Sequence, residues 1–147
     1  MTRFHKIGLL MLTALAIAGY AVQSGGATTS GATIEVRKVL IPSDDPGLFN
    51  LLVRRTASTL ITEVFDVGNG GHTARVAVPT GVNLTVEELA GTGTSLSNYS
   101  PSLDCFVQSG PDAGYHFPTV NYHGMVLVAK PGNNYTCVFT NTANGGG

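Results

Sequence analysis

The sequence has no surplus of basic residues, which argues against a nucleic-acid-binding protein. Eight Lys and Arg residues stand against nine Asp and Glu residues, and two of the basic ones, Arg3 and Lys6, lie at the extreme amino end. The rest of the chain is net acidic and has no basic stripe that could neutralise phosphates. We therefore expect no DNA or RNA partner.

Recognisable catalytic and cofactor motifs are also missing. The sequence contains no Gly-x-Ser-x-Gly nucleophile elbow, no P-loop and no dinucleotide fingerprint. His72, His116 and His123 are not spaced like zinc ligands, and we expect them on the surface. The Asp-Asp pair before Pro46-Gly47 favours a turn, because a calcium site takes about six to eight oxygens. We expect no metal, no cofactor and no enzymatic turnover.

No apolar run reaches the about 20 residues that a membrane-spanning helix needs. The run Ile7–Ala18 follows Arg3 and Lys6 and precedes several small residues. A basic start, an apolar middle and a small-residue exit indicate a secretory signal peptide, which we assign to residues 1–27. The alternative is an uncleaved amino-terminal anchor. We expect a secreted or cell-surface protein whose mature form has no membrane span.

Only two cysteines are present, Cys105 and Cys137, and both follow the signal peptide. An even number of cysteines in an exported chain favours a disulfide over free buried thiols or a redox couple. In the chain-entropy model, closing this loop stabilises the fold by roughly 3–4 kcal/mol.

No segment shows a helical period, and short β-patterned runs alternate with turn clusters instead. The expected strands are Ile34–Leu40, Leu48–Val53, Thr59–Phe65, Thr73–Val78, Val82–Leu89, Leu103–Val107, Tyr115–Val120, Met125–Ala129 and Tyr135–Asn141. About seven to nine short strands predict an all-β sandwich or barrel. A flexible linker of Gly, Ser and Thr composition (28–32) precedes the domain, and a Gly-rich tail (143–147) follows it.

Three polar residues share a strand face with apolar neighbours. Because side chains alternate along a strand, residues of equal parity lie on one face. Lys38 shares the face of Val36, and Glu88 shares the face of Val86, while Asn141 continues the face of the last strand. We expect all three side chains to point into the core, unless they reach solvent at the strand ends.

Buried charges are paired or change protonation, so a Lys38–Glu88 ion pair with an Asn141 hydrogen bond is one interpretation. The other is covalent. Desolvation lowers the pKa of a lysine and makes its neutral amine nucleophilic. The amine of Lys38 could then attack the Asn141 carbonyl while Glu88 polarises it and shuttles protons. The product is an isopeptide bond, formed once per molecule.

Three segments carry a family resemblance, VRKVLIPSDDPGLFNLLV (Val36–Val53), VGNGGHTARVAVPTGVNLTVEELAGTGTSLSNY (Val67–Tyr99) and NNYTCVFTNT (Asn133–Thr142). They resemble prealbumin-like, SpaA-type (CnaB-like) domains of bacterial extracellular proteins. The resemblance implies an Ig-like or transthyretin-like antiparallel β-sandwich over residues 33–142. It also implies a bond between a first-strand Lys and a last-strand Asn, assisted by an acid on a middle strand. The corresponding positions are Lys38, Asn141 and Glu88.

The resemblance implies a structural stalk or spacer at the cell surface, stabilised by the isopeptide bond. The Cys105–Cys137 disulfide expected from the cysteine count would stabilise it further. The alternative is an adhesin or a module that binds an extracellular protein or carbohydrate through exposed loops. Tyr99, Tyr115 and Tyr122 are candidates for such a surface, and they fit sandwich packing equally well. The sequence does not fix the oligomeric state.

Overall fold

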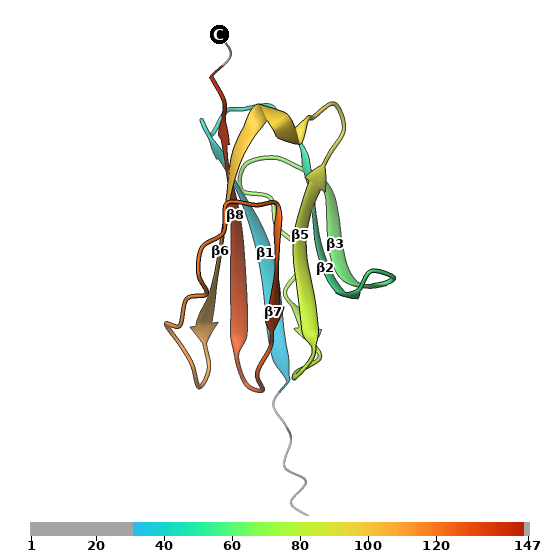
Figure 1. Ribbon diagram of the computed structural model, residues 1–147, viewed down its shortest axis with the longest axis vertical. Coiled ribbons are helices and arrows are strands. Elements are labelled where there is room, and N and C mark those ends of the chain that lie inside the picture. Colours follow the sequence, from blue (N-terminus) through green and yellow to red (C-terminus); the bar gives the residue numbers. More distant parts are fainter. Residues whose placement is uncertain (1–30, 146–147) are drawn as a thin grey trace, which may run out of the picture.

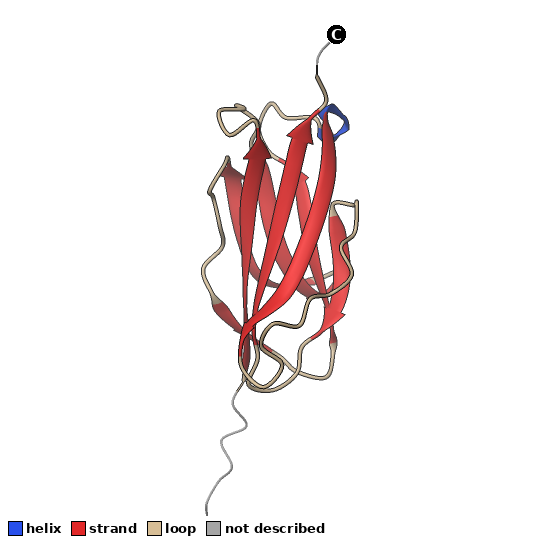
Figure 2. Ribbon diagram, turned by 90° about the vertical axis from the view of Figure 1, so that its left-hand side faces the viewer, coloured by secondary structure: helices blue, strands red, loops and turns tan. Residues whose placement is uncertain are grey.

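The computed structural model describes residues 31–145 and shows a sandwich of two four-stranded sheets (Figures 1 and 2). The strands are β1 (Ala32–Ile41), β2 (Phe49–Thr56), β3 (Thr59–Val67), β4 (Val76–Val78), β5 (Asn83–Ala90), β6 (Tyr99–Ser109), β7 (Gly124–Val128) and β8 (Asn134–Ala143). The expected all-β sandwich is confirmed. The signal peptide assigned to residues 1–27 lies outside the described residues, as does most of the linker.

The strand order places the first and last strands side by side. One sheet has the order β4-β1-β8-β6, and the other has the order β3-β2-β5-β7. All strand pairs are antiparallel except β1–β8, which is parallel and extends from Thr33–Asn134 to Ile41–Thr142. Because β1 and β8 run in the same direction, the start of β1 and the end of β8 lie at opposite ends of the sandwich (Figure 1).

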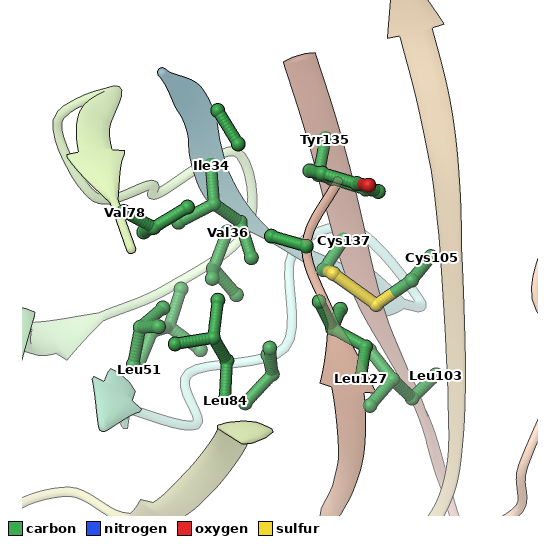
Figure 3. Close-up of a cluster of buried hydrophobic side chains, with 14 of the residues drawn as sticks. Ile34, Val36, Leu51, Val78, Leu84, Leu103, Cys105, Leu127, Tyr135 and Cys137 are labelled. Carbon is green, nitrogen blue, oxygen red and sulfur yellow. A yellow bond between two sulfur atoms is a disulfide. The ribbon is translucent and has the colours of Figure 1, made fainter. Parts of the chain in front are cut away.

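Strand alternation explains the core. In β1, Ile34, Val36 and Leu40 are buried, while Arg37, Val39 and Ile41 face outward. The apolar faces of the two sheets pack against each other, as the side chains in Figure 3 show. β1 ends where Pro42 follows, because proline has no N–H to donate to a ladder.

The predicted disulfide is present. Cys105 on β6 and Cys137 on β8 are paired directly across the antiparallel ladder, and their sulfur atoms are bonded within the core (Figure 3). Both residues are fully buried. The bond therefore fixes β6 to β8, the strand that also neighbours β1.

The expected strand Tyr115–Val120 is not a strand. This segment belongs to the long β6–β7 connection, which follows the edge of β6 and forms only isolated bridges, Leu103 with Val120 and Phe106 with His116. Pro118 lies between these bridges and cannot donate a ladder hydrogen bond, so continuous pairing is interrupted.

The one helical segment among the described residues is a 3-10 turn, Leu96–Asn98, at the end of the sandwich where β8 ends (Figure 2). Within residues 31–145, no helix has the length and apolar character needed to cross a membrane.

Candidate functional site

Three of the buried polar side chains, from three different strands, meet between the two sheets. Lys38 lies on β1, Asn141 on β8 and Glu88 on β5 of the opposite sheet. Their exposed fractions are 1%, 0% and 1%. Strand parity predicts this inward orientation. In the β1–β8 register Lys38 is opposite Phe139 and Leu40 is opposite Asn141, so Lys38 and Asn141 are diagonal neighbours on one face.

The carboxylate of Glu88 contacts both of the other side chains across the sandwich. Its Oε2 lies 2.8 Å from Lys38 Nζ, and its Oε1 accepts a 2.7 Å hydrogen bond from Asn141 Nδ2. The Lys38–Glu88 contact is an ion pair by distance but does not have hydrogen-bond alignment. One carboxylate thus brings the amine and the amide together.

The Asn141 side-chain carbonyl is buried without a partner. Among the described residues, no donor forms a hydrogen bond with its Oδ1. An unsatisfied buried acceptor costs about 1–3 kcal/mol, and most buried polar groups avoid that cost. The amide is therefore held through its nitrogen, while its carbonyl group has no hydrogen bond.

Burial dominates the electrostatics of Lys38. Desolvation lowers the pKa of its ammonium, and the neighbouring carboxylates of Glu88 and Asp45 oppose that shift. Lys38 Nζ also lies 4.1 Å from the centre of the Phe49 ring. The net lowering of the pKa favours the neutral amine, which is the nucleophilic form.

His123 is a member of this site that the sequence interpretation missed. We expected a surface histidine, but its Nδ1 lies 2.9 Å from Glu88 Oε1, and its side chain is 26% exposed. His123 immediately precedes β7, in a turn without strand alternation, so no periodic signal could have placed it. The other two expected surface histidines, His72 and His116, have side chains that are 60% exposed.

The turn after β1 contains Asp44 and Asp45, and the charge of Asp45 acts on Lys38. Asp45 Oδ1 accepts hydrogen bonds from the Gly47 N–H at 2.8 Å and from the Tyr99 hydroxyl at 2.6 Å. The Asp45 hydrogen bond, together with burial, raises the pKa of Tyr99 to about 12. The Tyr99 ring packs edge-on against Phe49, the ring beneath Lys38. The turn interpretation of this segment thus agrees with the structure.

Comparison with known families identifies the domain. A SpaA-type family model, described as a prealbumin-like fold domain, matches residues 49–143. The chain belongs to this family. The matched part of the SpaA-type domain includes Glu88, Cys105, Cys137 and Asn141, whereas Lys38 on β1 precedes it.

Solved structures similar to this SpaA-type domain include major pilins of Streptococcus pyogenes. A point mutant of one major pilin is 16% identical with a TM-score of 0.51, and the alignment covers 78% of this chain and 48% of that one. The T-13 major pilin is 14% identical with a TM-score of 0.49, and coverage is 78% and 46%. The chain thus spans about half the length of these pilins. The comparison with curated proteins gives no match.

Proposed function

We propose that this protein is an extracellular structural module whose first and last strands become joined by an isopeptide bond between Lys38 and Asn141. The observation that carries the proposal is the shared carboxylate. Glu88 Oε2 lies 2.8 Å from the Lys38 amine, and Glu88 Oε1 holds the Asn141 amide nitrogen at 2.7 Å. All three side chains are enclosed in the core, where water cannot compete with the amine.

The two oxygens of Glu88 suit two different proton transfers. Oε2 takes a proton from the Lys38 ammonium, which leaves a neutral amine beside a neutral carboxyl. The amine then attacks Asn141 Cγ, so that a bond forms between Nζ and Cγ. The Glu88 carboxyl group then turns so that its proton faces Asn141 Nδ2, which already lies 2.7 Å from Oε1. The bond between Cγ and Nδ2 breaks after Nδ2 receives that proton.

The proton balance of this reaction fixes what leaves the site. The Lys38 ammonium loses two protons on the way to the secondary amide. One completes the ammonia that departs from Asn141, and the other must leave the Glu88 carboxyl. The protein is consumed as its own substrate, so the reaction occurs once and is not enzymatic turnover.

The position of the proposed bond suits a load-bearing module. β1 and β8 are parallel neighbours, so tension applied at the start of β1 and the end of β8 would slide one strand past the other. A covalent bond between Lys38 and Asn141 would resist that sliding. The similarity in fold to a major pilin supports this role.

The extracellular location rests on the amino-terminal sequence and the disulfide. The Cys105–Cys137 bond requires an oxidising environment, as outside the cytoplasm. Fractionation of expressing bacteria, with amino-terminal sequencing of the exported protein, tests the location. We expect export and cleavage near residue 27, whereas a purely cytoplasmic, uncleaved chain would contradict it.

The alternative role, binding of a protein or carbohydrate through loop aromatics, has less support. Tyr115 and Tyr122 are 53% and 73% exposed, but they lie at different places on the β6–β7 connection. The Tyr115 carbonyl accepts a hydrogen bond from the Val107 N–H, whereas Val120, two residues before Tyr122, pairs with Leu103, nearer the start of β6. The two tyrosines are thus held at different positions along β6, which gives little support to a shared aromatic surface.

Intact-mass measurement of the reduced and denatured protein tests the cross-link. We expect the wild type to be lighter than its sequence by one ammonia. Lys38→Ala and Asn141→Ala should show their full calculated masses. Lys130→Ala is the matched control, because the Lys130 side chain is 70% exposed and forms an ion pair with Asp112. This variant should retain the ammonia deficit. A wild-type protein of full mass would overturn the proposal.

A further inference from the structure

The buried carboxylate of Glu88 has one polar neighbour that reaches solvent. Of the described side chains that contact it, Lys38 and Asn141 are fully buried, whereas His123 is 26% exposed. His123 Nδ1 contacts Oε1, the same oxygen that holds Asn141 Nδ2. A proton on that oxygen therefore has a direct path to an imidazole at the surface.

The position of His123 is fixed by main-chain contacts. The Glu88 N–H donates a 2.8 Å hydrogen bond to the His123 carbonyl, so the two residues are joined through both backbone and side chain. Gly124 follows and begins β7, where an added Cβ would lie only 2.9 Å from the Val86 carbonyl. The glycine thus allows the chain to approach β5 closely and brings His123 next to Glu88.

We infer that His123 is a positioning residue for the proposed cross-link, which relays the proton released by the reaction from Glu88 to solvent. This inference rests on the proposed function. A neutral imidazole with its hydrogen on Nε2 can accept at Nδ1 from a protonated Glu88 carboxyl. It then passes a proton to water from its exposed side.

A protonated imidazole has the opposite effect. It donates from Nδ1 to the Glu88 carboxylate, and a hydrogen bond to the charged form of a group stabilises that form. The Glu88 carboxylate and the Lys38 ammonium then persist as an ion pair, and the nucleophilic amine is not formed. Histidine changes charge between about pH 5 and pH 8, so cross-linking should slow as the pH falls through this range.

The other charged groups around the site do not supply this response. Lys38 on β1 and Glu88 on β5 are the reacting pair, Asp45 acts on Lys38 from the turn after β1, and β8 contributes the neutral Asn141. Glu87, the neighbour of Glu88, lies on the other face of β5 and pairs with Arg54. His123 is thus the one histidine among the described residues that contacts Glu88.

The rate of ammonia loss as a function of pH tests the relay. The full chain is isolated in denaturant before it has folded, and its full mass is verified. It is then diluted into buffers between about pH 5 and pH 8, quenched at intervals, reduced and weighed. Tyrosine fluorescence follows folding in the same samples, because the chain has five tyrosines and no tryptophan.

For the wild type we expect the cross-linking rate of folded protein to fall about tenfold toward the acidic end. The reason is that a hydrogen bond from a protonated His123 to the Glu88 carboxylate would preserve the ion pair with Lys38. His123→Asn places an uncharged amide near the Nδ1 position, so its rate should be lower at neutral pH and nearly independent of pH. His116→Asn is the matched control. It lies on the same connection but contacts the exposed Asp104, and it should keep the wild-type profile.

The outcomes separate the two proposals. If the wild type and His123→Asn cross-link with the same pH profile, the relay is wrong and the cross-link remains. If His116→Asn flattens the profile as much as His123→Asn does, the effect is not specific to Glu88 and the relay is again wrong. If the wild type loses no ammonia at any pH, the isopeptide bond itself is wrong, and the relay falls with it.

Discussion

Lys38 Nζ and Glu88 Oε2 lie 2.8 Å apart between the two sheets, and both side chains are completely buried. Two opposite charges in a dry core are costly to desolvate, and apolar replacements of similar volume are often neutral or stabilising. The Lys38–Glu88 pair is costly to bury and lies beside the Asn141 carbonyl, which has no hydrogen bond. A role in a reaction explains this arrangement better than a purely structural role. The isopeptide proposal supplies that chemistry.

Replacement of Glu88 by Gln should abolish the cross-link, because an amide cannot take the proton of the Lys38 ammonium. The variant should have its full calculated mass. It should also lose roughly 4–5 kcal/mol of unfolding free energy, the value that the chain-entropy model gives for closing a loop of about 100 residues. Mass spectrometry and denaturant titration measure the two effects.

Glu87→Gln is the matched control for this prediction. Glu87 is adjacent to Glu88 but is about a quarter exposed and faces away from the core toward Arg54. This variant should keep the ammonia deficit and nearly all of the stability. A Glu88→Gln protein that still lost ammonia would show that the carboxylate is not needed.

Loss of the disulfide should weaken the fold without preventing the cross-link. The Cys105→Ser and Cys137→Ser double variant opens a loop of 32 residues, which we expect to lower the unfolding free energy by about 3–4 kcal/mol. The ammonia deficit should persist, because β1 and β8 remain paired through their own ladder. A double variant that folds but has its full calculated mass would contradict this expectation, because it would show that the cross-link forms only when the disulfide is present.

The Asp45–Tyr99 hydrogen bond should contribute stability that is lost in alkali. The pKa of Tyr99 is raised from 10.0 to about 12 in the folded protein, so the folded state holds this proton more tightly than the unfolded state. The contribution is fully present below about pH 10 and disappears as the pH rises through about 12. The difference in unfolding free energy between wild type and Tyr99→Phe should follow this course. A difference that stays constant to the alkaline limit would contradict it.

Glu35 should contribute stability with the opposite pH dependence. The hydrogen bond from Arg37 and the charges of Arg37 and Arg75 lower the pKa of this carboxyl from 4.5, although burial opposes them. The contribution is therefore present above the unfolded value and is lost as the pH falls through the folded value. Acid unfolding curves of wild type and Glu35→Gln should converge at low pH. Curves that diverge further in acid would show that Glu35 does not stabilise the fold through its ionised carboxylate.

Strand parity correctly predicted the burial of Lys38, Glu88 and Asn141. Lys38, Glu88 and Asn141 each lie on strands long enough for alternation to define a face. Parity could not show that β1 and β8 are neighbours or that Glu88 reaches them from the other sheet. Those contacts depend on strand order, which links residues far apart in the sequence.

Sequence reasoning was wrong where the chain is irregular. The segment Tyr115–Val120 has β-forming residues, but Pro118 limits its pairing with β6 to isolated bridges. His123 lies in the turn that ends this connection, and its role depends on a tertiary contact with Glu88. Turn residues have no periodicity that reports which way a side chain points.

Tryptic peptide mapping of the reduced wild-type protein tests the Lys38–Asn141 bond most directly. Trypsin does not cleave after a lysine whose side-chain nitrogen is acylated. The account predicts a branched peptide that joins the segment around Lys38 to the segment around Asn141 and lacks one ammonia. Recovery of a linear peptide that ends at a cleaved Lys38, together with an unmodified peptide containing Asn141, would contradict it.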